Sequence, residues 1–264
     1  MESHDSLTPA GHPDFGTVVH TLEPANDPSV IVVCEHASRR IPEQLGDMGL
    51  SQSALRSHIA WDPGALPVAQ AIARQMSAAL IYGGVSRLVY DCNRPPEASD
   101  AMPARSEEIA IPSNSRLSEI ERENRVAEVY TPFCTELGGM LERYGDTLEL
   151  MVTIHSFTPV YRGQNRSVEL GLLHGEDDRF ALEMMETKAS DLSLKTRLNE
   201  PYSAADGVAH TLDFHATPRG LLNVMIEIRN DLIQTPEQQQ AMADALVPWL
   251  DRTLNAIQGR GVAL

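Results

Sequence analysis

The chain has 264 residues, 42% of them hydrophobic and 22% charged, which is enough apolar material for one large domain or two small ones. Its 37 acidic residues outnumber 21 basic ones and give a net charge of −16, which argues against nucleic acid or an anionic membrane as a partner. The sequence shows no membrane-spanning apolar run and no signal peptide. Its three cysteines are too scattered for a disulfide framework. We therefore expect a reduced, cytoplasmic protein.

The first half of the chain alternates apolar runs with helix-like segments. Residues 1–27 are polar and rich in Pro, Gly and His, which predicts a loose arm or an edge segment. Asp62-Pro63-Gly64 is typical of a helix start, with Asp62 as the N-cap and Pro63 in the first turn. The elements expected here are a strand at 29–34, a helical segment at 51–58 capped by Ser51, a helix at 65–78, and short strands at 79–82 and 87–91.

The second half continues this alternation but contains two long polar segments. Residues 95–115 include four prolines, and residues 199–218 hold Tyr202; loops of this length are usually functional or disordered. The other elements expected here are one or two helices at 118–144 with a break near Thr131-Pro132, strands at 148–154, 167–173 and 222–229, and helices at 177–190 and 236–256. No repeat or linker divides the chain. The pattern therefore predicts a single domain over residues 1–264, a three-layer α/β sandwich around a mixed, largely parallel sheet.

Four polar clusters follow or interrupt the predicted strands. Catalytic groups collect at such places in open α/β sheets, because the carboxyl ends of the strands form a crevice. Any one cluster could be structural, but burying all four without a function would leave several polar groups unpaired. The clusters are Glu35/His36, Asp91/Asn93/Arg94, His155/Ser156 and Glu227/Arg229.

His36 and His155 are the best candidate metal ligands. Neutral imidazole suits zinc and similar divalent metals, and two histidines with one carboxylate leave a position for water. The third ligand stays open between Asp62, which could instead be an ordinary helix cap, and Glu35, whose side chain diverges from that of His36 on extended chain. His58 is expected to support the site or the fold. No HExxH motif is present, which excludes the thermolysin-type arrangement.

Glu227 is the candidate general base. It is a lone carboxylate in an otherwise apolar run, and a water-poor cleft could raise its pKa toward the working pH. The alternative is a buried ion pair with Arg229, which shares its face of the strand, or with another arginine.

The arginines predict an anion pocket in an otherwise acidic protein. Arg94, with Asn93 and Arg87, could hold a substrate carboxylate, and Arg39 or Arg162 could hold a second one. Surface ion pairs, the usual fate of arginine, are the alternative. From the second long segment, Tyr202 could donate a hydrogen bond to the substrate.

These residues resemble two related groups of enzymes. The strands with His155 and Glu227 look like the last zinc-histidine strand and the catalytic-glutamate strand of zinc carboxypeptidases, and Asn93-Arg94 resembles the pair with which those enzymes hold a substrate carboxylate. Over nearly the whole chain, however, the sequence is more similar to the N-formylglutamate amidohydrolase family. The blocks that carry this resemblance are residues 35–42, 58–64, 86–94, 199–203 and 226–232.

The resemblance implies a phosphorylase/hydrolase-like fold and an amidohydrolase with zinc or another divalent metal as cofactor. Its partner would be a small-molecule substrate, an N-acyl acidic amino acid such as N-formylglutamate, from which it removes a formyl or similar acyl group. One position departs from the related carboxypeptidases and deacylases, which place a zinc-binding glutamate three residues after the first histidine. Arg39 stands there, so either Asp62 replaces the glutamate or the metal site is altered. The alternatives are an enzyme acting on a larger acyl group or a C-terminal peptide bond, and a non-catalytic anion-binding protein that has lost the metal.

Overall fold

The computed structural model describes residues 15–190, 192–202 and 206–260, and these form a central seven-stranded sheet. Its strands are β1 (Val19–Leu22), β2 (Val30–Cys34), β3 (Ala79–Gly83), β6 (Leu150–Phe157), β9 (Leu170–Leu173), β10 (Thr196–Leu198) and β11 (Leu222–Arg229). In space they follow the order β1-β3-β2-β6-β11-β9-β10. The central strands β3, β2, β6 and β11 are parallel, β1 is antiparallel to β3, and the parallel pair β9/β10 runs antiparallel to β11.

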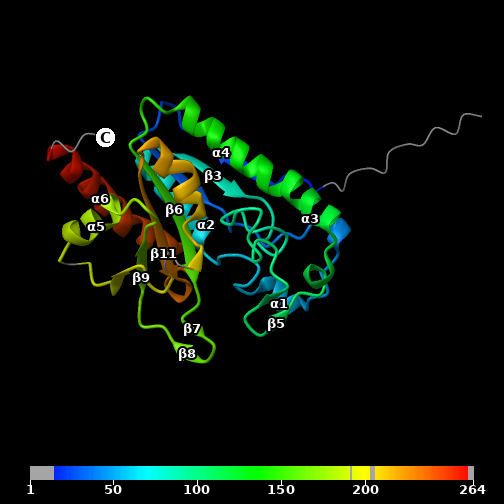
Figure 1. Ribbon diagram of the computed structural model, residues 1–264. Coiled ribbons are helices and arrows are strands. Elements are labelled where there is room, and N and C mark those ends of the chain that lie inside the picture. The colour runs from blue at the N-terminus through cyan, green and yellow to red at the C-terminus, as the bar shows by residue number, and fades with distance from the viewer. Residues whose placement is uncertain (1–14, 191, 203–205, 261–264) are drawn as a thin grey trace, which may run out of the picture.

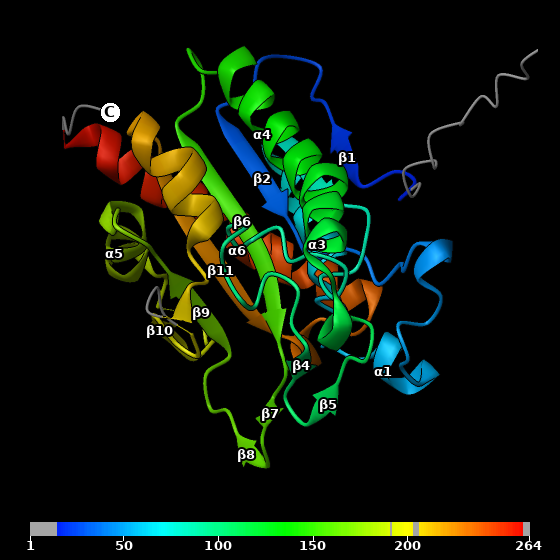
Figure 2. The same cartoon turned by 45° about the vertical axis from the view of Figure 1, so that its right-hand side comes forward.

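Helices cover both faces of this sheet (Figures 1 and 2). One face carries α2 (Ala65–Met76), α5 (Arg179–Thr187) and α6 (Pro236–Gly259), and the other carries α4 (Thr131–Arg143) together with α1 (Gln52–Arg56) and long loops. Side chains alternate between two apolar clusters, with Val30 and Val32 in the first and Ile31 and Val33 in the second. The three-layer α/β fold with a mixed, largely parallel sheet is thus confirmed.

The predicted helix after residue 64 is present as α2, but Asp62 is not its N-cap. The cap is Gly64, whose φ of 83° lies in the left-handed region, and no side chain caps the helix. A Cβ on Gly64 would lie 2.4 Å from the carbonyl oxygen of Ile233, so the turn needs glycine here. Because the helix begins after this turn, the Asp62 side chain is free for another role.

The predicted break near Thr131-Pro132 is a change of helical register. Helix α3 (Glu119–Arg125), capped by Ser118, continues through a π-helical turn at Val126–Tyr130 into α4. Proline has no N–H to donate to the carbonyl four residues earlier. This favours a change from α-helical to π-helical hydrogen bonding just before the proline.

Three further expectations about the elements were wrong or incomplete. Residues 87–91 are turns and not a strand, because the Ser86 hydroxyl accepts from the Leu88 N–H and closes the chain on itself. Residues 210–216 are helical, ending in a π-helical turn at Leu212–Ala216. Strand β6 extends to Phe157, so His155 lies inside the strand rather than after it.

Short elements complete the described chain. Two small hairpins, β4 (Arg105–Ser106) with β5 (Ile109–Ala110) and β7 (Val160–Tyr161) with β8 (Gln164–Asn165), extend from the sheet end that carries the polar clusters (Figure 2). Of the predicted arm, residues 1–14 lie outside the described residues, and the remainder contains the edge strand β1. No helix in the described part of the chain is long and apolar enough to cross a membrane.

Candidate active site

The parallel strands β2, β6 and β11 bring their polar residues to one end of the sheet. Glu35 and His36 directly follow β2, and His155 on β6 is paired in register with Glu227 on β11. Met151 and Met225 on these strands belong to the apolar cluster beneath α4. Because side chains alternate along a strand, His155 and Glu227 point to that same face.

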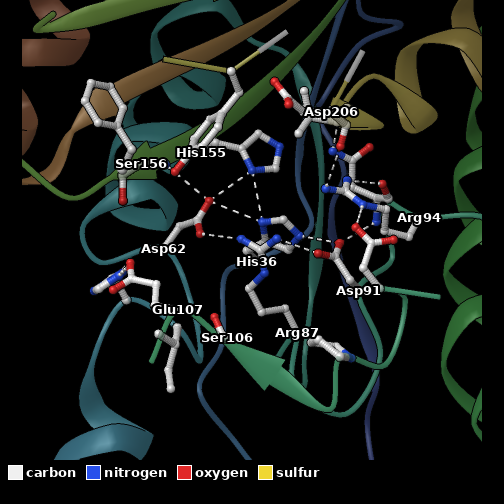
Figure 3. A pocket seen from close by; sticks show the side chains of 18 of the residues that line it. His36, Asp62, Arg87, Asp91, Arg94, Ser106, Glu107, His155, Ser156 and Asp206 are labelled. Atoms are coloured by element: carbon white, nitrogen blue, oxygen red, sulfur yellow. Dashed lines mark hydrogen bonds and ion pairs between the residues drawn. The ribbon is translucent and has the colours of Figure 1, made fainter. Parts of the chain in front are cut away.

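His36, His155 and Asp62 converge in a buried cluster (Figure 3). The Nδ1 atoms of the two histidines are 3.1 Å apart, and Asp62 Oδ2 lies 3.3 Å from Nδ1 of His36 and 2.9 Å from Nδ1 of His155. In a tetrahedral zinc site with bonds of about 2.0–2.1 Å, ligand atoms are about 3.3 Å apart. Two nitrogens and one carboxylate oxygen at these separations therefore fit a divalent metal such as zinc.

Asp62, and not Glu35, supplies the third donor atom of this cluster. The Asp62 side chain accepts a hydrogen bond from the Ser156 N–H, and its own N–H donates to the His36 carbonyl, so both strands orient it. Glu35 lies on the other edge of the His155 ring, with Oε2 3.1 Å from Nε2. The geometry thus favours Asp62 in the choice that the sequence left open.

Each histidine of the cluster has a carboxylate beside its outer nitrogen. Asp91 Oδ1 lies 2.7 Å from Nε2 of His36, and Glu35 occupies the matching position at His155. The hydrogen bond with Asp91 holds the proton of His36 on Nε2 and leaves its Nδ1 free to bind a metal. The contact between Glu35 and His155 lacks hydrogen-bond geometry, but the negative charge beside Nε2 favours the same tautomer. Burial opposes charge on these groups, but contacts with Glu35 and Asp62 raise the pKa of His155 well above its ordinary value. Arg87, 2.5 Å from Asp91 Oδ2, and His36 likewise lower the pKa of Asp91 against the effect of burial.

We expect Glu35→Gln to weaken metal affinity by about 10- to 100-fold, the usual effect of losing such an outer partner. The substitution keeps the shape of a fully buried side chain but removes the negative charge that lies 3.1 Å from Nε2 of His155. Competition with a chelator would measure the change. Glu23→Gln, which alters a carboxylate paired with Arg143, is the control, and equal metal affinity in both variants would contradict this role.

Glu227 is buried in the same cavity and is not used in an ion pair with Arg229. Its Oε2 has no hydrogen-bond partner among the described residues. Arg229 instead contacts Asp231 at 2.8 Å and Glu169 at 3.5 Å, so the ion-pair alternative for Glu227 was wrong. Burial raises the pKa of Glu227 to about 7, although the nearby histidines oppose this shift. A carboxylate with this pKa can both accept and release a proton near neutral pH.

The cavity has a volume of about 550 Å³, and residues of both long polar segments line it. Arg87, Arg94 and Arg162 are among the lining residues. Arg87 is paired with Asp91 and Asp62, whereas Arg162 is exposed and makes no ion pair within the described chain. Arg94 contacts Asp100 at 2.8 Å and the carbonyls of Asn93 and Asp206.

Of two further predicted substrate-binding residues, Asn93 lines the cavity and Arg39 does not. Arg39 is exposed, does not line the cavity, and lies with its guanidinium 5.7 Å from the ring centroid of Trp61. The Asn93 amide donates to the Val208 carbonyl and accepts from the Thr211 N–H, so it attaches the second long segment to the site. Contact of Asn93 with substrate stays a prediction.

Sequence reasoning gave no role to Asp91 and only an alternative one to Glu35. Both residues belong to the polar clusters at the strand ends, and this position was the only signal that they belong to the site. Their contacts with the histidines could not be predicted from spacing, because Asp91 is 55 residues from His36 in the chain. His58, expected to support the site, lines the cavity and contacts Glu107 at 2.7 Å.

Comparisons with known proteins identify similar folds and a family. The structure of the gene product Atu2144 from Agrobacterium tumefaciens has a TM-score of 0.89 and 48% identity, covering 92% of this chain and 97% of its own. N-formylglutamate amidohydrolase from Ralstonia eutropha JMP134 shares the fold with a TM-score of 0.62 and 15% identity, over 93% of this chain and 99% of its own. No curated protein matches the chain. The family model for N-formylglutamate amidohydrolase matches residues 28–234, a span that contains the whole cluster, Glu227 and the lining arginines. The chain therefore belongs to the N-formylglutamate amidohydrolase family of hydrolases.

Proposed function

We propose that this protein is a metal-dependent amidohydrolase that removes a formyl or similar acyl group from an N-acyl acidic amino acid, with N-formylglutamate as the first candidate substrate. One observation carries the proposal: three metal-donor atoms converge in a cavity that also contains a buried, unpartnered carboxylate, Glu227. Membership of the family supports amide hydrolysis as the reaction.

His36, Asp62 and His155 would hold zinc or another divalent ion. Such an ion supplies Lewis-acid polarisation of the amide carbonyl and lowers the pKa of water. The position of Asp62 in the cluster supports this ligand set, because it provides a carboxylate donor although Arg39 stands where related enzymes have a zinc-binding glutamate.

Glu227 moves the protons of the reaction. Its carboxylate removes a proton from water as the water oxygen bonds to the acyl carbon. It then gives the proton to the amine nitrogen as the C–N bond breaks. Burial that raises the pKa of Glu227 to about 7 suits both steps, because the group changes protonation state near neutral pH.

Arginines at the cavity wall would orient the substrate through its carboxylates. Arg162 has the most available charge, since it is exposed and unpaired within the described chain. The guanidinium of Arg94 would bind a substrate carboxylate while it also contacts Asp100. The Asp100 side chain is 54% exposed and able to move aside. Arg87 holds Asp91 and Asp62 in place and completes the positive side of the cavity.

Hydrolysis of a panel of N-acyl amino acids tests the proposal. The metal-loaded protein should release glutamate from N-formylglutamate faster than from its acetyl and succinyl analogues, and faster than it cleaves N-formylated neutral amino acids. A chelator should remove the activity and added metal should restore it. Absence of turnover of every compound by the metal-loaded protein would contradict the proposal.

A further inference from the structure

Arg166 lies beside the cavity and has no part in the function proposed above. Its guanidinium carbon is 4.5 Å from the ring centroid of Tyr161, 4.8 Å from that of Tyr202 and 5.5 Å from that of Phe157. Three aromatic rings restrict the guanidinium to one place and orientation. Arg166 Nη1 also donates to the Thr158 carbonyl oxygen at 3.5 Å.

The polar contact of Arg166 with this ring cluster is a hydrogen bond to Tyr202. Arg166 Nη1 donates to the Tyr202 hydroxyl oxygen at 3.0 Å. A guanidinium has only donor hydrogens, so the phenol must act as the acceptor in this bond. The hydroxyl hydrogen of Tyr202 therefore points elsewhere and stays available as a donor.

The Tyr202 side chain borders the cavity that contains Glu227 and His155. With Tyr161 and Asp206, it also borders a second hollow of about 450 Å³ that Arg166 lines, whereas Arg166 is not among the residues that line the reaction cavity. Burial and the neighbouring Glu227 raise the pKa of Tyr202 to about 12, which keeps the phenol protonated at neutral pH. A protonated hydroxyl at this wall can donate to an oxygen in the cavity.

We propose that Arg166 is a positioning residue: by donating to the Tyr202 oxygen from behind, it directs the Tyr202 hydroxyl hydrogen toward an oxygen of the bound substrate. This inference rests on the proposed amidohydrolase function. The positive charge also polarises the phenol and makes it a stronger donor than an isolated tyrosine. Loss of Arg166 would leave the hydroxyl free to turn its hydrogen away from the substrate.

A double-mutant cycle tests the inference. Arg166→Gln should lower kcat/KM for N-formylglutamate by about tenfold or more, the scale of a lost charge-assisted hydrogen bond. Tyr202→Phe keeps the ring and its contact with Arg166 but removes the hydroxyl, and it should cause a similar loss. Adding Arg166→Gln to Tyr202→Phe should then change kcat/KM by less than about twofold, because the two residues act as one unit. Arg166→Lys, which retains a cationic donor, should recover part of the activity.

The same cycle separates positioning from packing. If Arg166 only supported the three rings, Arg166→Gln would lower kcat/KM by the same factor in the wild-type and Tyr202→Phe proteins, and that result would overturn the inference. Arg143→Gln is the matched control, since it also removes an arginine 5.7 Å from a tyrosine ring, at Tyr144 and away from the cavity, and it should leave kcat/KM unchanged. Melting temperatures would verify that the variants fold. Active wild-type protein with an uncoupled cycle would refute this inference alone, whereas wild-type protein inactive on all N-acyl amino acids would refute the proposed function and this inference with it.

Discussion

Glu227→Gln should lower kcat for amide hydrolysis by at least about a hundredfold while the bound metal is retained, because that is the usual scale of general-base catalysis. Glutamine has the shape of glutamate but cannot accept a proton from water. Glu227 is not one of the three converging donors, so metal content by elemental analysis should equal that of the wild-type protein. Activity near the wild-type level would show that another group is the base.

The pH profile gives an independent check on the same residue. Burial raises the pKa of Glu227 to about 7, and the base works only when deprotonated. Wild-type kcat/KM should therefore be constant above this pKa and fall about tenfold per pH unit below it. The residual activity of Glu227→Gln should lack this acid-side fall. The control is Glu183→Gln, which changes a buried glutamate of α5 that is paired with Arg260. This variant should keep the wild-type profile.

His155→Ala should abolish metal binding and with it hydrolysis. The imidazole supplies one of three donor atoms and also separates two buried carboxylates, Asp62 and Glu35. We expect the metal content of untagged protein, by elemental analysis, to fall from about one ion per chain to near zero. His20→Ala, which removes a histidine stacked on Tyr82 and absent from the cavity lining, should retain full occupancy.

A folding defect could mimic this result, because removing His155 leaves buried carboxylates without a partner. Two measurements separate the causes. The variant should show the circular dichroism of a folded α/β protein, and chelator-treated wild-type protein should lose activity and regain it with added metal. A folded His155→Ala protein with full metal occupancy would mean that the ligands lie elsewhere.

The main elements and the outline of the site were predictable from local patterns. A continuous β-branched run identified β2, and a largely apolar run identified β11, because strands covered on both faces have no polar alternation. His155 and Glu227 stood out as polar residues within apolar runs, and the structure places them side by side in register. Residues 87–91 were misjudged for the same reason: Leu88, Val89 and Tyr90 are buried, so an apolar turn in the core resembled a strand.

The partners of these residues depended on contacts between distant segments. Asp62 was ambiguous because an N-cap and a metal ligand require the same residue type; the turn at Gly64 and the Ser156 N–H decided between them. Arg39 and Arg162 were equal candidates in the sequence, yet Arg39 lies on Trp61 outside the cavity and Arg162 lines it.

The sequence by itself determined the layered α/β fold and the family, and it singled out two histidines and one glutamate that the structure places in the same cavity. These follow from periodicity and from residue type, which are local properties of the chain. Only the tertiary structure decided that Asp62 joins the histidines, that Asp91 and Glu35 stand behind them, and that Arg166 faces Tyr202. Each of these contacts joins residues between 26 and 120 positions apart in the chain, and such contacts are set by sheet order and packing rather than by any local pattern.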